Sequence, residues 1–184
     1  MKDTLVILMD CWDYKPGETS SKDNLRSTMC KNINDFVEDN SNRIHMVVDA
    51  HYDLANRPAH PDISKEDWRV SVLHMEDVDP VVQIIHDQKI KNVYYLGIHW
   101  NRCIRNRQLG YVQIMERLQG LGIQVNIYTV KNCTLENIHT ERRQHAPVYE
   151  RVPDFASDPV TELKHVEGDI WQILGTRKDW NGKI

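Results

Sequence analysis

The chain has 184 residues, with 27 acidic and 23 basic side chains and a formal net charge of −4. This length fits one domain, which we expect to span residues 1–184. A hydrophobic fraction of 40% indicates a globular chain and not a disordered one. The acidic balance argues against general nucleic-acid binding. The longest apolar run, Leu5–Met9, is far too short to span a membrane.

The four cysteines favour a reducing compartment. Their spacing matches no zinc signature and no dense disulfide scaffold. The start, Met1-Lys2-Asp3, leads directly into an apolar run and leaves no room for a signal peptide. We therefore expect a cytoplasmic protein with free thiols, in which each cysteine either fills the core or acts as a nucleophile.

Strand and helix patterns alternate along the chain. Short apolar runs predict strands, and apolar residues repeated at three or four positions predict helices. Capping signals at Asp79-Pro80 and Asp158-Pro159 predict two further helix starts. In chain order, the predicted elements are strand Thr4–Met9, helix 21–40, strand Arg43–Val48, strand Trp68–Met75, a helix from Asp79, strand Asn92–Ile98, helix Cys103–Gln119, strand Ile123–Val130 and helix 159–174. Residues 131–157 have no clear pattern and are interpreted as either a lid or an interface.

The alternation predicts an α/β fold with a doubly wound, mostly parallel sheet. Because the early strands are apolar on both faces, helices should cover both sides of the sheet in a three-layer αβα, Rossmann-like arrangement. Active sites of such folds lie beyond the C-terminal ends of the strands. The chain has no Gly-x-Gly-x-x-Gly motif and no phosphate loop, which argues against a nucleotide-binding domain.

Among the residues that follow predicted strands, Cys103 is the strongest candidate for a nucleophile. It comes shortly after a predicted buried strand, at the start of a predicted helix. The free N–H groups of a helix N-terminus stabilise a thiolate and lower its pKa. Positive charge on Arg102, Arg105 and Arg107 should act in the same direction. The alternative is a small residue that packs the helix onto the sheet.

Asp10 ends the first apolar strand. A carboxylate at this position is partly desolvated, which suits a general base. If the first and fourth strands are neighbours, Asp10 and Cys103 can face each other as base and nucleophile. The alternative role for Asp10 is to cap the turn that follows the strand.

Two segments give the chain a resemblance to a known family. Leu5–Tyr14 (LVILMDCWDY) and Tyr95–Ile104 (YLGIHWNRCI) resemble the first strand and the cysteine block of the isochorismatase-like cysteine hydrolases, which include nicotinamidases. The resemblance runs in order through nearly the whole chain. It implies catalytic roles for Asp10 and Cys103. It also implies a cis peptide at Ile98–His99, with the N–H groups of His99 and Cys103 forming an oxyanion hole.

The chain departs from the family pattern at the third catalytic residue. The family has a lysine after its third strand, where this sequence has His74 and no lysine. His74 is predicted to act as the proton shuttle or the thiolate partner, unless the triad is broken. Two tryptophans also replace the usual glutamine and threonine. The predicted substrate-binding residues are Trp12, Tyr14, Trp100 and Arg102.

The resemblance also implies a candidate metal site. Asp49-Ala50-His51 matches the Asp-x-His motif of the nicotinamidases, and His60 is the third candidate ligand. Two histidines and one carboxylate suit zinc, iron or manganese. The alternative is a polar loop in which Asp49 caps a turn.

The resulting hypothesis is a hydrolase that cleaves the C–N bond of a small amide or carbamoyl compound through a thioester on Cys103. The alternative is a non-catalytic relative that binds a ligand or partner because the lysine is missing. Since members of the family commonly form dimers or tetramers, a homodimer or homotetramer is the expected assembly.

Overall fold

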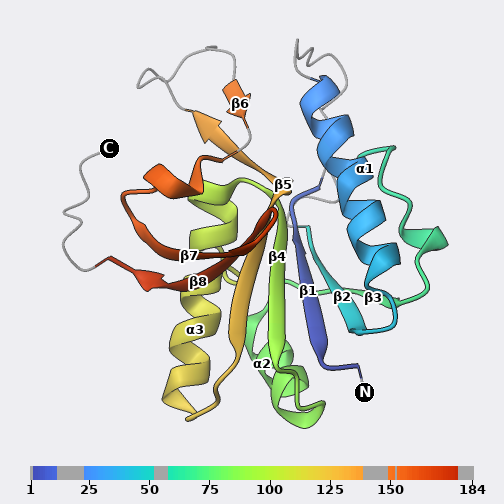
Figure 1. The fold of residues 1–184 in the computed structure, drawn as a ribbon. Coiled ribbons are helices and arrows are strands. Elements are labelled where there is room, and N and C mark those ends of the chain that lie inside the picture. Colours follow the sequence, from blue (N-terminus) through green and yellow to red (C-terminus); the bar gives the residue numbers. More distant parts are fainter. Residues whose placement is uncertain (1, 12–22, 52–57, 139–148, 152, 178–184) are drawn as a thin grey trace.

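The computed structural model describes residues 2–11, 23–51, 58–138, 149–151 and 153–177. These residues form an α/β fold in which helices pack against a mixed, mostly parallel sheet (Figure 1). The strand order is β3-β2-β1-β4-β5-β8-β7, and β6 pairs with β5 outside this path. Their bounds are β1 Thr4–Met9, β2 Ile44–Ala50, β3 Ser71–His74, β4 Asn92–Ile98, β5 Asn126–Ile138, β6 Tyr149–Arg151, β7 Thr161–Glu167 and β8 Ile170–Thr176.

The central strands run parallel, from β3 through β2, β1 and β4 to β5. All six residues of β1 are buried, as expected for a strand covered on both faces. On one face, α1 (Asp23–Asp39) packs its apolar stripe of Met29, Ile33 and Val37 against the sheet. On the other face, α2 (Val78–Asp87) and α3 (Tyr111–Gly120) contribute to a second core cluster. Parallel pairing of β1 with β4 confirms the predicted neighbourhood of these two strands.

The predicted last helix, 159–174, is wrong. Thr161–Glu167 and Ile170–Thr176 are instead β7 and β8, an antiparallel hairpin that extends the sheet beyond β5. Leu163 pairs with Ile173, and both side chains pack on the core face of the hairpin. Gly168, at φ +50°, allows the tight turn between the strands. The apolar spacing of this segment fits both the two-residue period of a strand and the 3.6-residue period of a helix. Pairing of β8 with β5 decides in favour of strands.

Asp158 explains why a helix signal precedes a strand. Its Oδ1 accepts the backbone N–H groups of Val160 and Thr161, at 2.8 and 3.1 Å. These are the contacts an N-cap residue makes, but the backbone continues as an extended strand. Its Oδ2 accepts the indole N–H of Trp100 at 2.8 Å, which ties the hairpin to the turn after β4.

The predicted helix 103–119 is split in two. A π-helical turn, Trp100–Ile104, follows β4, and α3 begins only at Tyr111. Gly110 lies between them, and a Cβ there would come within 2.5 Å of the Arg105 carbonyl oxygen. The predicted strand 123–130 begins later and runs on to Ile138, so part of the segment 131–157 belongs to β5 and β6. Its remaining residues, 139–148 and 152, lie outside the described ranges.

The remaining predicted elements match the structure to within a few residues. Strand 68–75 shortens to β3, and Trp68 is buried before it, with its indole N–H donated to Asn34 at 3.2 Å. A short 3₁₀ turn, Lys65–Asp67, precedes it.

No helix in the described ranges is long and apolar enough to cross a membrane.

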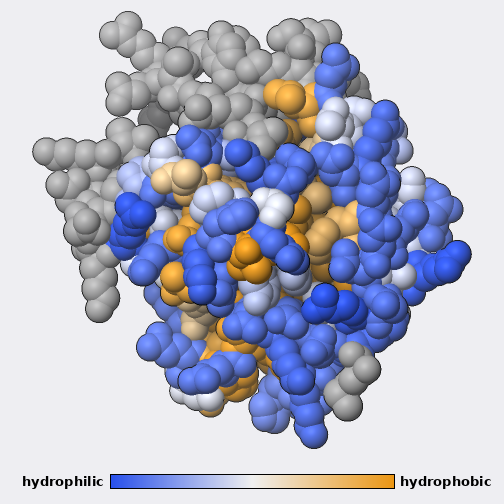
Figure 2. Space-filling model, in the orientation of Figure 1, coloured by the Kyte–Doolittle hydropathy of each residue, from blue (hydrophilic) through white to orange (hydrophobic). Residues whose placement is uncertain are grey.

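A groove lined by both apolar and polar side chains runs beside α3 at the N-terminal end of the parallel strands. Met115 and Leu118 of α3, Ile123 and Ile127, and Leu174 of β8 are among its lining residues. Figure 2 shows hydrophobic atoms at the surface in this lower part of the molecule, surrounded by hydrophilic side chains. The groove therefore lies at the opposite end of the sheet from the residues that follow β1 and β4.

Candidate active site

Asp10 and Cys103 come together at the C-terminal edge of the sheet. Asp10 directly follows β1, and Cys103 lies in the turn after the neighbouring strand β4. The carboxylate of Asp10 is only 2% exposed, and it forms a hydrogen bond with the Cys103 thiol. A thiol and a carboxylate in this contact can exchange a proton directly. The structure therefore brings together the two residues for which sequence analysis predicted catalytic roles.

Asp10 adopts an uncommon backbone conformation at this position. Its φ of +48° lies in the left-handed region, which aspartate visits more readily than most residues. Its N–H donates to the carbonyl of Ala50 at 3.1 Å, at the end of strand β2. Strained conformations persist where the surrounding structure imposes them, and they cluster at functional sites. The local geometry turns the chain sharply at the point where the carboxylate meets the thiol.

The turn after β4 places one backbone N–H group at the Cys103 sulfur. The Ile98–His99 peptide is cis, as the family resemblance implied. The carbonyl of His99 accepts the N–H groups of Arg102 and Ile104, both at 3.1 Å. The backbone N–H of His99 in turn hydrogen-bonds to the Cys103 sulfur. A donor at this sulfur is suitably placed to stabilise negative charge on it or beside it.

The resting state of Cys103 differs from the sequence-based expectation. Burial raises the pKa of the thiol, and the negative charge of Asp10 raises it further. The backbone of His99 and the guanidinium of Arg107 lower the pKa, but they do not outweigh burial. Cys103 is therefore a neutral thiol at pH 7 and needs a base to ionise it, whereas the helix-end argument predicted a lowered pKa.

Arg107 is one of the three arginines that sequence analysis placed near Cys103, and it is the one that approaches Asp10. Its Nη2 lies 3.6 Å from Oδ2 of Asp10, and its side chain is 46% exposed. It also forms a side-chain hydrogen bond with Cys103. The signal in the sequence is the spacing of four residues from Cys103, which puts both side chains on one side of a helical turn. The Arg107 N–H donates to the Cys103 carbonyl at 3.2 Å, which confirms that turn.

His74 does not join this group. It ends β3, which is separated from β1 by the whole of β2. Its side chain is 39% exposed, and its Nε2 lies 3.4 Å from Oε1 of Glu76. The prediction that His74 assists Cys103 therefore has no geometric support. His74 lies at the same end of the sheet as Asp10, but β2 separates its strand from β1.

Trp100 is a core residue and not an open wall of a pocket. It is only 3% exposed, and its ring stacks on Tyr111 with centroids 5.8 Å apart. Phe155 contacts it at a centroid distance of 4.8 Å. Arg102, in contrast, is exposed on the same turn. Trp12 and Tyr14, the other two predicted substrate-binding residues, lie outside the described residues.

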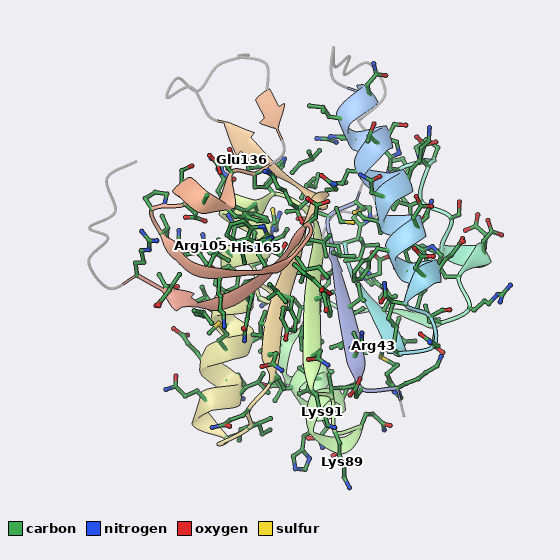
Figure 3. The ribbon with its side chains drawn as sticks, in the orientation of Figure 1. Arg43, Lys89, Lys91, Arg105, Glu136 and His165 are labelled. Atoms are coloured by element: carbon green, nitrogen blue, oxygen red, sulfur yellow. The ribbon has the colours of Figure 1, made fainter. Side chains whose placement is uncertain are left out.

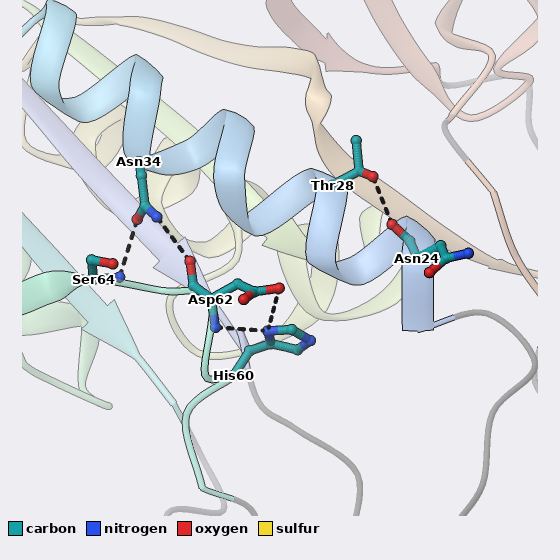
Figure 4. A network of polar contacts seen from close by, with 6 residues as sticks. All are labelled: Asn24, Thr28, Asn34, His60, Asp62 and Ser64. Atoms are coloured by element: carbon teal, nitrogen blue, oxygen red, sulfur yellow. Dashed lines mark hydrogen bonds and ion pairs between the residues drawn. The ribbon is translucent and has the colours of Figure 1, made fainter.

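The structure does not bring the three candidate metal ligands together in one group. The Nζ of Lys65 lies 2.5 Å from Oδ2 of Asp49, so an ammonium already neutralises this buried carboxylate. The Nδ1 of His60 accepts the N–H of Asp62 at 3.2 Å, within a polar network that ties this loop to α1 (Figure 4). His51 is fully buried. Within the part of the chain that the structure describes, no three His, Cys, Asp or Glu side chains are grouped to hold a metal ion.

The Lys65–Asp49 pair should contribute measurably to stability. We expect Lys65→Met to lower the free energy of unfolding by about 3 kcal/mol, because it leaves a buried carboxylate without its counter-charge. Urea denaturation measures this change. The matched control is Lys91→Met, since Lys91 lies 4.0 Å from Asp3 and is 71% exposed; its cost should stay below about 0.5 kcal/mol. Equal effects of the two substitutions would contradict the role assigned to Lys65.

Charged side chains are present at both edges of the sheet. Arg43, Lys89 and Lys91 lie at the N-terminal edge, whereas Arg105 and Glu136 lie toward the C-terminal edge (Figure 3). The group formed by Asp10, Cys103 and Arg107 is therefore separate from the basic side chains that precede β2 and β4.

Comparison with known proteins adds no family. No protein-family model and no curated protein matches this chain. Membership of the isochorismatase-like hydrolases therefore stays a hypothesis, based on the two sequence segments that carry the resemblance.

Proposed function

We propose that this chain is a cysteine-dependent hydrolase of the isochorismatase-like type, with a three-layer αβα fold. Its substrate would be a small amide or carbamoyl compound whose C–N bond is cleaved. The single observation that carries this proposal is the hydrogen bond between the buried carboxylate of Asp10 and the Cys103 thiol. The His99 backbone contact with the same sulfur supports it.

The proposed reaction begins with proton transfer from the Cys103 thiol to Asp10. The sulfur attacks the carbonyl carbon, and the resulting oxyanion is held by the backbone N–H groups of His99 and Cys103. The C–N bond then breaks, and the leaving amine takes the proton from Asp10. Water attacks the thioester, with Asp10 as base, and the proton returns to sulfur as the acid product leaves.

The alternative function is ligand binding without turnover. The observation in its favour is that burial raises the pKa of Cys103, which leaves the sulfur protonated at rest. The contact with Asp10 favours catalysis, because a neutral thiol beside a carboxylate is the starting state of general-base activation. A small-molecule substrate, a cytoplasmic location and a homodimer or homotetramer complete the proposal.

The proposal can be tested with an activated ester, which reports on the nucleophile without knowledge of the natural substrate. The protein is mixed with p-nitrophenyl acetate at pH 7.5, and the acylated residue is mapped by mass spectrometry. We expect acetylation at Cys103, with Cys11, Cys30 and Cys133 unmodified because all three are buried. Ammonia release from small amides, nicotinamide first, then defines the substrate. Acetylation spread over several residues, or absent from Cys103, would argue against the hydrolase.

A further inference from the structure

The guanidinium of Arg107 contacts both Asp10 and Cys103. Its guanidinium approaches the buried carboxylate of Asp10 at 3.6 Å and hydrogen-bonds to Cys103. Its side chain is 46% exposed, whereas that of Asp10 is 2% exposed. Arg107 therefore extends from solvent to a buried acidic group.

We propose that Arg107 is the fixed cation of this site, which pairs with the Asp10 carboxylate and stabilises negative charge on the Cys103 sulfur and on an anionic group that approaches it. This inference rests on the proposed function and names the residue that supplies its positive charge. Within the described ranges, the ionisable side chains that act on Cys103 are Asp10, directly after β1, and Arg107, from its own turn. They carry opposite charges, so the sulfur lies between one group that opposes its ionisation and one that favours it.

The chemistry of arginine limits what Arg107 can do. A guanidinium stays protonated in proteins, so Arg107 cannot shuttle a proton as a lysine or histidine could. Proton transfer must then run between Cys103 and Asp10 alone, while Arg107 supplies a constant charge. Since its side chain is half exposed, part of this charge also faces the solution from which a substrate arrives. We therefore expect the site to favour neutral or anionic substrates over cationic ones.

The test compares two alkylating reagents on Cys103, neutral iodoacetamide and anionic iodoacetate, in the wild type, Arg107→Met and Arg107→Lys. The ratio of the iodoacetate rate to the iodoacetamide rate should fall about fivefold in Arg107→Met, as expected for loss of a half-exposed charge. Arg107→Lys should restore most of the ratio. The iodoacetamide rate of Arg107→Met should also require a higher pH to reach half of its maximum.

The matched control is Arg117→Met, since Arg117 forms an exposed pair with Asp79 at 2.7 Å on the surface. It should leave both rates at Cys103 unchanged. A purely structural role for Arg107 would change both reagents alike, so an unchanged ratio in Arg107→Met overturns the inference. Failure of the hydrolase proposal gives a different result, because wild-type Cys103 would then not be acetylated by p-nitrophenyl acetate, whatever the alkylation ratio is.

Discussion

Cys103→Ala is expected to lower the release of p-nitrophenol from p-nitrophenyl acetate by about a thousandfold or more, to the rate of the protein's other nucleophiles. Loss of a catalytic nucleophile has effects of this size or larger, because the atom that would carry the proposed covalent intermediate is gone. In this chain the sulfur is the atom that contacts the Asp10 carboxylate and the His99 backbone. Removal of the sulfur leaves the base, Asp10, in place but takes away the atom that would accept the acyl group. The initial rate of nitrophenol release, followed by absorbance, measures the effect.

The control for this substitution is Cys30→Ala. Cys30 is also a buried, free cysteine, but it lies in α1 within the core cluster on the opposite face of the sheet from α2 and α3. We expect Cys30→Ala to retain the wild-type rate of nitrophenol release. The assignment of Cys103 would be wrong if Cys103→Ala released nitrophenol as fast as Cys30→Ala.

The second large effect is expected on stability, from Gly97→Ala. Gly97 lies in β4 opposite Met9 of β1, at a φ of +107°, which side-chain-bearing residues rarely adopt. A Cβ there would lie 2.1 Å from the Met9 carbonyl oxygen, a backbone atom that cannot move without shifting β1. We expect the free energy of unfolding to fall by about 4 kcal/mol or more, from strain and overpacking together.

Urea denaturation of Gly97→Ala should be compared with that of Gly120→Ala. Gly120 is the last residue of α3, and no atom lies within 4 Å of a Cβ built there. Gly120→Ala should leave stability unchanged or raise it by about 0.5–1 kcal/mol. Equal urea midpoints of unfolding for the two variants would show that the β1–β4 contact tolerates a side chain at position 97. Because Asp10 directly follows Met9, this contact also helps to position the carboxylate.

The parallel part of the fold was predictable because its signals are local and consistent. The apolar run Thr4–Met9 and the four-residue spacing in α1 each allow one interpretation, and alternation then predicts the parallel sheet. The hairpin of β7 and β8 was not predictable in this way. Its apolar spacing and the cap at Asp158 suit a helix, and only pairing with β5 makes it part of the sheet.

The candidate site was predictable where topology alone determines a position. Asp10 and Cys103 follow neighbouring parallel strands, so their meeting follows from the strand order. The contacts that Arg107 makes with Asp10 and that Lys65 makes with Asp49 depend on the directions of long side chains. The sequence gives only weak signals for these directions. Trp100 was misjudged because a large aromatic residue after a strand can either line a pocket or, as here, pack into the core against Tyr111.

The most direct measurement of the Asp10–Cys103 contact is the rate of Cys103 alkylation by iodoacetamide as a function of pH, in the wild type and in Asp10→Asn. Burial and the charge of Asp10 raise the pKa of the wild-type thiol, so its rate should still be rising above pH 8.5, the ordinary value for a free thiol. Asp10→Asn removes the charge and should move the profile to lower pH, which makes alkylation at pH 7 faster. The exposed carboxylate variant Asp79→Asn should leave the profile unchanged. If Asp10→Asn and the wild type have the same profile, Asp10 does not act on Cys103 and the proposed site is wrong.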